Sequence, residues 1–243
     1  MWRTVKAGLW RWRGIIVTAP TVAGVVIGLR TFGLLQIPEL MVLDQFYRWR
    51  PAEPMDDRVV LVRITEQDIQ NVGEWPVSDR VLARVLNQLK QQKPRAIGLD
   101  LYRDLPKEPG HAELVKVFES TPNLIGIQKV VGKTLADTVN PPPILKKAGQ
   151  VGANDVVLDL DNKARRNLVS VRDRQKNTIL SLSARLALLY LAAEQVELEV
   201  LDAAKSRVKL GKTIYEPMPA TDGSYVGADV GGYQVMANFR NLK

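Results

Sequence analysis

The apolar stretch over residues 14–36 constrains this chain more than any other feature. It reads GIIVTAPTVAGVVIGLRTFGLLQ and carries a single charged residue, Arg30. A helix that crosses a bilayer needs about 20 predominantly apolar residues, and backbone amides in lipid must be satisfied within the segment itself. We therefore predict one transmembrane helix over residues 14–36, with membrane lipid as its partner. Arg30 lies close enough to the far end for its side chain to reach the headgroups.

The residues before this stretch predict its orientation. Residues 1–13 contain four Lys or Arg residues, three Trp residues and no acidic residue. Basic flanks stay cytoplasmic, and tryptophans gather at the membrane interface. We predict a cytoplasmic N-terminus over residues 1–13, an anchor in the plasma (inner) membrane, and an extracytoplasmic or periplasmic chain from about Ile37. Two alternatives fit less well. A cleaved signal peptide needs a shorter apolar region and a small-x-small cleavage site, and a buried core helix rarely follows so basic a start.

The net charge of +8 does not by itself predict a nucleic-acid partner. Four of the basic residues precede the apolar stretch, and the others are scattered singly or in pairs among acidic residues. They form no basic-aromatic stripe, so we predict no nucleic-acid binding. The sequence contains no cysteine, which excludes disulfides, thiolate metal ligands and cysteine nucleophiles.

Residues 37–54 predict a juxtamembrane helix and linker. Leu40, Leu43 and Phe46 recur at helical spacing, and Pro51 and Pro54 end the helix. The residues from 55 to 243 suit one extracytoplasmic domain.

The first half of this domain alternates between strand and helix patterns. Residues 58–65 form an apolar run typical of a strand that is buried on both faces. A helical pattern over residues 78–92 leads to a second apolar strand over 95–101, which makes a βαβ unit. A helix over 112–120 and a third strand over 123–128 follow. We predict a layered α/β fold with a mostly parallel sheet and flanking helices, preceded by the one N-terminal transmembrane helix.

The second half of the domain is less regular. The predicted elements are short strands within 149–161, a strand over 168–172, a central buried helix over 178–195, a β-hairpin over 207–215 and a strand over 233–240. The hairpin turns at Gly211-Lys212. A chain that stops just beyond an apolar strand indicates a C-terminally incomplete domain.

No catalytic signature is present. The sequence lacks a P-loop, a dinucleotide-binding glycine fingerprint and a nucleophile elbow. His111 is the only histidine, so a metal site or a His-based triad has almost nothing to build on. We predict no cofactor and no metal, and a solvated or helix-capping role for His111.

Polar side chains follow each of the three predicted parallel strands. They are Glu66 and Asp68 after the first strand, Asp100, Arg103 and Asp104 after the second and Lys129 after the third, with Trp75 on an intervening loop. In open α/β sheets, ligands bind outside the carboxyl ends of the strands. These residues therefore predict a rim suited to a small polar ligand or a partner loop. The alternative is an ordinary network in which the carboxylates pair with Arg80 or Arg103 and Trp75 is a packing plug.

Several motifs in order carry a family resemblance. They are GLLQIPELMVLDQFYRWRP, DDRVVLVRITEQDI, GEWPVSDRVLARVLNQL, PRAIGLDLYRDLP and NLIGIQKV, with a weaker continuation through GANDVVLDLDNKARRNLV and SLSARLALLYL. This succession resembles the type-two CHASE domain, an extracellular sensory domain associated with cyclases and histidine kinases. The resemblance covers nearly the whole chain from about Leu34. The segment DLPKEPGHAELVKVF is similar to versions in cyanobacterial proteins, and the chain resembles an N-terminal fragment of such a receptor.

The resemblance implies a membrane-anchored, non-catalytic sensor that relays a small-molecule or protein signal to a cytoplasmic cyclase, diguanylate cyclase or kinase module. That output is not among these residues, and we expect the parent receptor to be a homodimer. The family's ligands are generally undefined, so the resemblance assigns no binding residue. One alternative is a structural scaffold without a ligand. Another is a membrane-tethered hydrolase that uses Glu66, Asp100 or Asp104.

Overall fold

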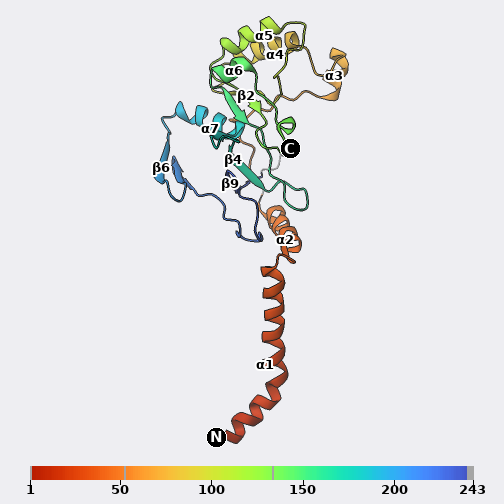
Figure 1. The fold of residues 1–243 in the computed structure, drawn as a ribbon, viewed down its shortest axis with the longest axis vertical. Coiled ribbons are helices and arrows are strands. Elements are labelled where there is room, and N and C mark those ends of the chain that lie inside the picture. The colour runs from red at the N-terminus through yellow and green to blue at the C-terminus, as the bar shows by residue number, and fades with distance from the viewer. Residues whose placement is uncertain (1, 52, 133, 240–243) are drawn as a thin grey trace. The chain divides into compact units, whose positions relative to one another are not determined.

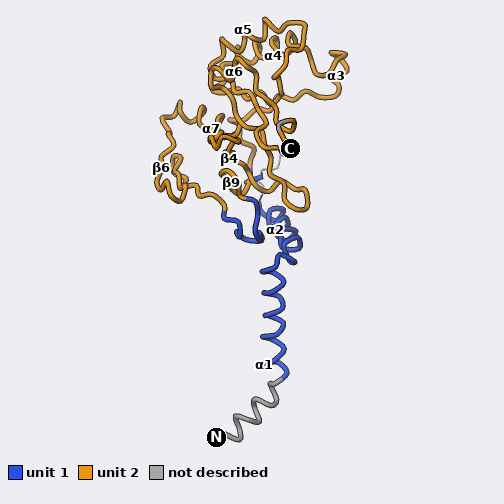
Figure 2. The backbone as a smooth tube through the Cα atoms, viewed as in Figure 1, with its two compact units in different colours: residues 1–53, 219–229, 239–241 blue, residues 54–218, 230–238, 242–243 orange. Residues whose placement is uncertain are grey.

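The structure is a computed structural model that describes residues 2–51, 53–132 and 134–239. The chain forms two compact units (Figure 2). The first contains the residues up to 53 together with 219–229 and Phe239, and the second contains residues 54–218 and 230–238.

The first unit contains two helices, α1 (Trp2–Thr31) and α2 (Gln36–Trp49) (Figure 1). α1 includes an 18-residue window, Gly14–Thr31, that is long and apolar enough to cross a membrane, and none of this window is buried. The helix predicted over residues 14–36 therefore ends at Thr31. Gly33 has a positive φ of 75°, a left-handed conformation that glycine tolerates and that separates α1 from α2.

The side chain of Arg30, which we predicted to reach the headgroups, makes two contacts within the first unit. Its Nε donates to Glu39 Oε1 at 3.0 Å, and its Nη2 donates to the Gly223 carbonyl oxygen at 2.7 Å. Arg30 thus joins the end of α1 to α2 and to the loop over residues 219–229.

The second unit is built around a parallel sheet of three short strands, β1 (Ile97–Gly98), β2 (Leu124–Gln128) and β3 (Val151–Ala153). The strand order is β1-β2-β3, and both pairings are parallel. Parallel neighbours need crossover connections. α5 (His111–Glu119) lies between β1 and β2 in the chain, and α6 (Pro143–Lys147) lies between β2 and β3.

Helices pack on both faces of this sheet. α4 (Asp79–Gln91), α5 and α6 bury apolar side chains on one face, and α7 (Leu182–Ala192) lies against the other. The core on the first face comprises Leu82, Ala83, Leu86, Ile97, Leu99, Leu114, Val117, Phe118, Leu124 and Leu145. The spacing of three and four residues in α4 and α5 places these side chains on one side of each helix.

α7 approaches the sheet closely because two glycines face it. A Cβ atom at Gly98 would lie 2.6 Å from Leu186 Cδ1, and one at Gly152 would lie 2.6 Å from the Cα atom of Leu182. α7 is shorter than the predicted helix, because Thr178–Leu180 forms β5 and the hydroxyl of Ser181 then caps α7 by accepting from the Ala184 amide. No residue along α7 is fully buried, so the prediction of a central buried helix is wrong in that respect.

Two further sheets are antiparallel. β4 (Arg166–Arg172) lies between β5 (Thr178–Leu180) and β9 (Tyr233–Met236), whereas β6 (Leu198–Asp202), β7 (Arg207–Leu210) and β8 (Thr213–Tyr215) form a meander. The predicted hairpin turn at Gly211-Lys212 is confirmed between β7 and β8. The prediction of a mostly parallel sheet is wrong, because two of the three sheets formed by the described residues are antiparallel. Tight turns rather than helices connect β4 to β5 and β6 through β8, and such turns join antiparallel strands.

The apolar run over residues 58–65 is not a strand, and this prediction is wrong for the arrangement described. The segment has no regular secondary structure and pairs with no described strand, and its Val59, Val60 and Leu61 are exposed. A strand forms only where a neighbour takes up its backbone hydrogen bonds. The segment leads into α3 (Glu66–Val72), and the short 3₁₀ helix η1 (Leu135–Asp137) completes the described elements.

Candidate functional site

The carboxyl edge of the parallel sheet gathers polar side chains from two strand ends. Asp100 and Tyr102 follow β1, and Asn154 and Asp155 follow β3. The amide Nδ2 of Asn154 donates to Asp100 Oδ1 at 2.7 Å, which joins the two strand ends directly. We call these four residues the sheet rim. Open α/β sheets bind their ligands at this edge.

Asp155 also fixes the loop that follows β2. Its carboxylate accepts from the Val130 amide at 3.0 Å and from the Val131 amide at 2.7 Å. Hydrogen bonds to an ionised acceptor are stronger than neutral ones, so this pair of contacts holds the carboxylate in place. The ends of all three parallel strands are thereby connected.

Tyr102 adds a phenol to the sheet rim. Partial burial raises the pKa of Tyr102 above its ordinary value, a hydrogen bond with Asn154 lowers it, and the carboxylates of Asp155 and Asp100 raise it further. The phenol is therefore protonated at neutral pH and can donate a hydrogen bond. Carboxylate acceptors beside a phenol suit a polar ligand that itself carries hydrogen-bond donors.

A second polar cluster surrounds the buried carboxylate of Asp79 at the start of α4. His111 Nδ1 lies 2.8 Å from Asp79 Oδ2, and Arg103 Nε lies 3.6 Å from Asp79 Oδ1. The Lys107 amide also donates to Asp79 Oδ2, at 3.2 Å. The side chains of Asp79 and Arg103 are 2% and 6% exposed, so both charges are removed from solvent. His111 therefore contacts a buried carboxylate, while its side chain is 40% exposed, as the solvated role predicted for it implies.

Comparison with protein-family models decides the family. The model described as the CHASE2 domain matches residues 21–242. The chain belongs to the CHASE2 domain family. This family consists of extracellular sensory domains of signalling receptors. Comparisons with curated proteins and with solved structures gave no match. The resemblance found in the sequence is thus confirmed, while the cyanobacterial origin stays a prediction.

Two of the predicted site residues of this CHASE2 domain have structural partners outside the sheet rim. Arg103 pairs with Asp79, and its Nη2 donates to the Val77 carbonyl oxygen at 2.5 Å. Asp68 forms a capping box with Thr65 at the start of α3, and its hydrogen bond to the Thr65 hydroxyl is the main cause of its lowered pKa. Glu66 lies exposed in the first turn of α3.

The other predicted residues occupy separate positions. Asp100 belongs to the sheet rim, and Asp104 is half-buried. Lys129 is exposed, and its backbone forms an antiparallel bridge with Val139. Trp75 is 53% exposed, which argues against the packing plug of the alternative interpretation. A binding role for Trp75, Asp104 and Lys129 stays a prediction.

Sequence reasoning missed Asn154 and Asp155. Residues 149–161 were assigned to several short strands, although Val151–Ala153 followed by two polar residues repeats the strand-then-polar pattern of β1 and Asp100. That pattern would have added both residues to the predicted rim.

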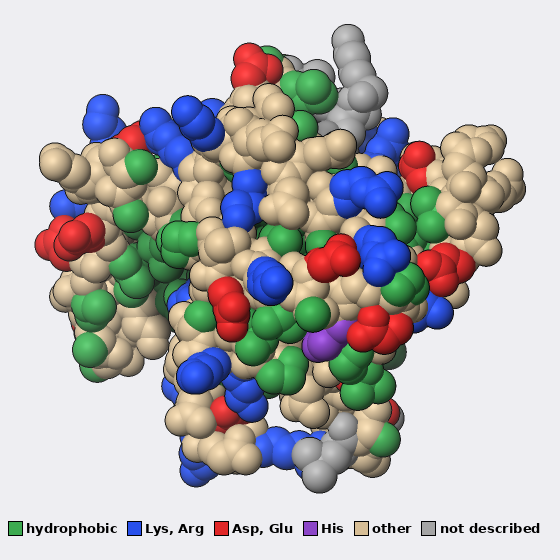
Figure 3. All heavy atoms as spheres, turned by 90° about the horizontal axis from the view of Figure 1, so that it is seen from above, with side chains coloured by type: hydrophobic (Ala, Val, Ile, Leu, Met, Phe, Trp, Pro, Cys, Tyr) green, Lys and Arg blue, Asp and Glu red, His purple; other side chains and the backbone are tan. Residues whose placement is uncertain are grey.

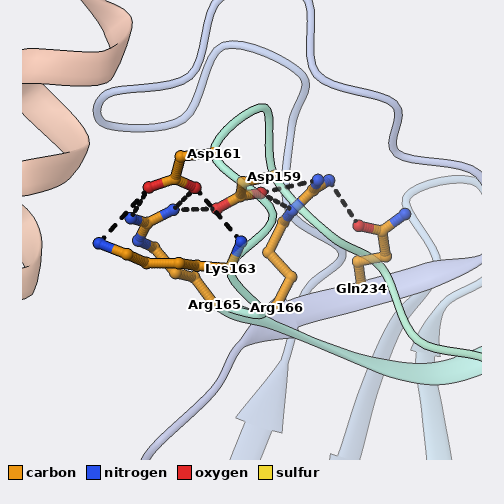
Figure 4. A network of polar contacts seen from close by, with 6 residues as sticks. All are labelled: Asp159, Asp161, Lys163, Arg165, Arg166 and Gln234. Atoms are coloured by element: carbon orange, nitrogen blue, oxygen red, sulfur yellow. Dashed lines mark hydrogen bonds and ion pairs between the residues drawn. The ribbon is translucent and has the colours of Figure 1, made fainter.

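A third polar cluster joins the loop before β4 to β9 (Figure 4). Arg165 Nη1 and Arg166 Nε donate to the two oxygens of Asp159 at 2.8 and 2.9 Å, and Arg166 Nη1 donates to Gln234 Oε1 at 2.9 Å. All four side chains are buried. Removing one member of such a cluster leaves a buried charge without a partner, whereas the intact cluster holds its side chains in one arrangement. We interpret it as a structural tie.

The described residues show no metal centre, and the face drawn in Figure 3 shows no broad basic area. Among them, no group of three or more His, Cys, Asp or Glu side chains could hold a metal ion. On the described residues of the face in Figure 3, basic and acidic side chains are interspersed rather than gathered by sign. Such a face differs from the basic surface that binds a phosphate backbone.

Proposed function

We propose that this CHASE2 domain is the non-catalytic, extracytoplasmic input domain of a transmembrane receptor, and that it relays a signal to a cytoplasmic cyclase- or kinase-type output. One observation carries the proposal: the CHASE2 match over residues 21–242 overlaps an apolar helix, Gly14–Thr31, of which nothing is buried. A helix of that length without protein cover is stable in lipid, where its backbone bonds are internal.

The charges around the anchor support an orientation with the N-terminus inside. The test uses the absence of native cysteines, because single-cysteine variants can be labelled selectively. In intact cells, a membrane-impermeant maleimide should label Ser120→Cys, which lies outside in the proposal. It should label Thr4→Cys only after permeabilisation. Labelling of Thr4→Cys alone in intact cells would overturn the orientation.

We propose that the sheet rim receives the signal. Asp100, Asn154 and Tyr102 are joined across two strand ends, and their chemistry suits a small polar ligand with hydrogen-bond donors. A ligand that binds only the folded chain at about a hundred times its Kd stabilises it by about 2.7 kcal/mol. Thermal-shift screening of the full chain in detergent should therefore find such a ligand.

The rim variants define the expected outcome. Asp100→Asn and Asn154→Ala should abolish the thermal shift, whereas Glu199→Gln, an exposed carboxylate on β6, should retain it. A shift that survives both rim variants would place the binding site elsewhere. Turnover of an ester or phosphate substrate that is lost in Asp100→Asn would instead support the hydrolase alternative.

A second candidate function is that of a scaffold in a receptor assembly. It is favoured by one face of α2, on which Val42 and Phe46, four residues apart, are exposed. Exposed apolar faces mark contact surfaces, and we propose that this face pairs with a second copy of the chain. Oxidation should crosslink Val42→Cys into dimers more readily than Asp44→Cys, which lies on the opposite side of the helix. Equal yields would contradict a dimer contact through this face.

A further inference from the structure

Residues 58–65 leave a run of large apolar side chains uncovered. Val59, Val60, Leu61, Val62 and Ile64 are between 42% and 81% exposed. A soluble surface rarely keeps so many consecutive apolar side chains in water. Side chains along a strand point alternately to its two faces, and in this run apolar side chains occur on both. This is the composition of a strand that is covered on both faces.

The parallel sheet has an unpaired edge that such a strand would fit. β1 is first in the order β1-β2-β3, and among the described strands it pairs with β2 alone. The amides of Ile97 and Leu99 donate to the Asn123 and Ile125 carbonyl oxygens. Alternate residues of a parallel strand bond to opposite neighbours, so the backbone of Gly98 faces away from β2. Gly98 is exposed, so another strand could form backbone hydrogen bonds with this side of β1.

Both segments begin in the same surroundings. Arg95, just before β1, pairs with Glu194 at 2.6 Å, and its guanidinium lies 4.4 Å from the ring centre of Tyr190. The pKa of Arg58 is raised chiefly by its hydrogen bond and ion pair with Asp56, and further by Tyr190 and Glu194. Arg58 therefore interacts electrostatically with Tyr190, in α7, and with Glu194, which follows α7. The two segments thus share electrostatic neighbours at their starts, as a parallel pair requires.

The connection between them supports the same topology. α3 and α4 lie between the two segments in the chain, and α4 packs on the face of the sheet that α5 and α6 also cover. A strand, a helix packed on the sheet and a neighbouring parallel strand make a βαβ unit, whose crossover is almost always right-handed.

We propose that residues 59–64 of the same chain add to the free edge of β1 as a fourth, parallel strand, so that this domain has a docked arrangement besides the undocked one described. The occupant is the chain's own segment rather than a second copy, because the packed helix α4 connects it to β1 as the crossover of a βαβ unit does. Docking would bury the five apolar side chains and satisfy the open backbone groups of β1.

The docked arrangement has two consequences for signalling, and these rest on the proposed function. The end of the new strand would bring Thr65, Glu66 and Asp68 to the same sheet edge as Asp100, so a ligand at the sheet rim would favour docking. The segment also continues from α2 through residues 50–57, and its movement would be passed to the juxtamembrane helix. A signal of this kind needs a ligand with different affinities for the two arrangements.

The test of docking is disulfide formation between engineered cysteines, which the chain's lack of native cysteine makes selective. Aligning Arg58 with Arg95 predicts that Val59 lies opposite Ala96 and that Arg63 lies opposite Asp100. Neighbouring strands about 4.8 Å apart allow a disulfide between facing positions. Mild oxidation of the full chain in detergent should therefore form an intramolecular disulfide in the double variant Val59→Cys/Ala96→Cys. The double variant Arg63→Cys/Asp100→Cys should form one as well.

The matched control is Val62→Cys with Asp100→Cys, in which a shift of one residue moves the cysteine to the other face. This pair should close much more slowly than the Arg63→Cys pair. Equal closure of all three pairs, or of none, would overturn the proposal, since it would indicate random collision or no approach. Disulfide-linked dimers in place of internally crosslinked monomers would show that the segment of a second copy, rather than the chain's own segment, occupies the edge of β1.

Hydrogen exchange on the unmodified chain gives an independent measurement if a cysteine pair prevents folding. Docking should slow exchange at alternate amides of residues 59–64 by about tenfold or more relative to an unstructured chain. Leu61→Asp should remove that protection while β2 stays protected. Unprotected amides in the unmodified chain would overturn docking. None of these outcomes depends on membrane topology, so a failure of docking and a failure of the proposed function can be distinguished.

Discussion

Asp79 is the buried carboxylate at the centre of the polar contacts between the starts of α4 and α5. Its carboxylate lies between buried Arg103 and half-exposed His111. Asp79→Ala would leave the Arg103 cation buried without a counter-charge, a change that costs about 3–5 kcal/mol. We expect denaturant unfolding in detergent to show a loss of that size.

The matched control for Asp79 is Arg80→Ala. Arg80 pairs with Glu113 at 3.5 Å, and both side chains are more than half exposed. Exposed pairs contribute about 0–1 kcal/mol, so this variant should unfold almost as the unmodified chain does. Equal losses in the two variants would show that the Asp79 cluster is solvated.

Asp161 gives the domain a predicted response to acid. The hydrogen bonds from Arg165 are the main cause that lowers the pKa of Asp161 to about 2, from an ordinary value of 3.8. A carboxyl group with a lowered folded-state pKa stabilises the fold fully above the unfolded value, and this contribution disappears as the pH falls through the folded value. We expect the difference in melting temperature between the unmodified chain and Asp161→Asn to be constant above about pH 5. It should shrink between pH 3.8 and 2. A difference that stays constant to pH 2 would contradict this role.

At the scale of elements, two glycines set how closely α7 packs on the parallel sheet. A Cβ atom at Gly152 would meet backbone atoms of Leu182, whereas one at Gly98 would meet the end of the flexible Leu186 side chain. Overpacking costs about 1–3 kcal/mol where the neighbour cannot move. Gly152→Ala should therefore lower the free energy of unfolding by that amount, and Gly98→Ala should lower it less. The reverse order would mean that α7 can shift as a unit.

The elements also show which parts of the fold the sequence could predict. The helices α4 and α5 and the strand β2 follow from apolar spacing, because Leu82, Leu86, Leu114 and Phe118 each lie on one side of a helix. Of the antiparallel pairings, only the β7–β8 hairpin was predicted, since a strand such as Arg166–Arg172 does not indicate the direction of its neighbour. The run over residues 58–65 has the composition of a strand, yet composition does not show whether a partner edge is occupied. For the site, Asp100 was predicted from its place after a strand. The Asp79–Arg103 pair could not be predicted, because Arg103 is brought to Asp79 by tertiary packing.

At the scale of the whole molecule, the receptor interpretation depends on how strongly lipid holds α1. The window Gly14–Thr31 has a mean hydropathy of 1.6 and includes Pro20 and two central glycines, Gly24 and Gly28. The helix is therefore only moderately apolar, and a charged side chain near its centre should strongly reduce its insertion into the membrane. An Arg at the centre of a spanning helix costs about 2.5–3.5 kcal/mol on insertion scales.

Ala23→Arg should accordingly shift a large share of the full-length chain from the carbonate-resistant membrane fraction to the soluble or aggregated fraction. Ala23→Leu at the same position should remain fully in the membrane fraction, because it adds apolar surface without charge. If both variants remained equally membrane-bound, α1 would not be the anchor, and the exposed face of α2 would be the next segment to test. If both were soluble and folded, the apolar helix would be covered by protein rather than lipid, and the extracytoplasmic placement of the domain would lose its support.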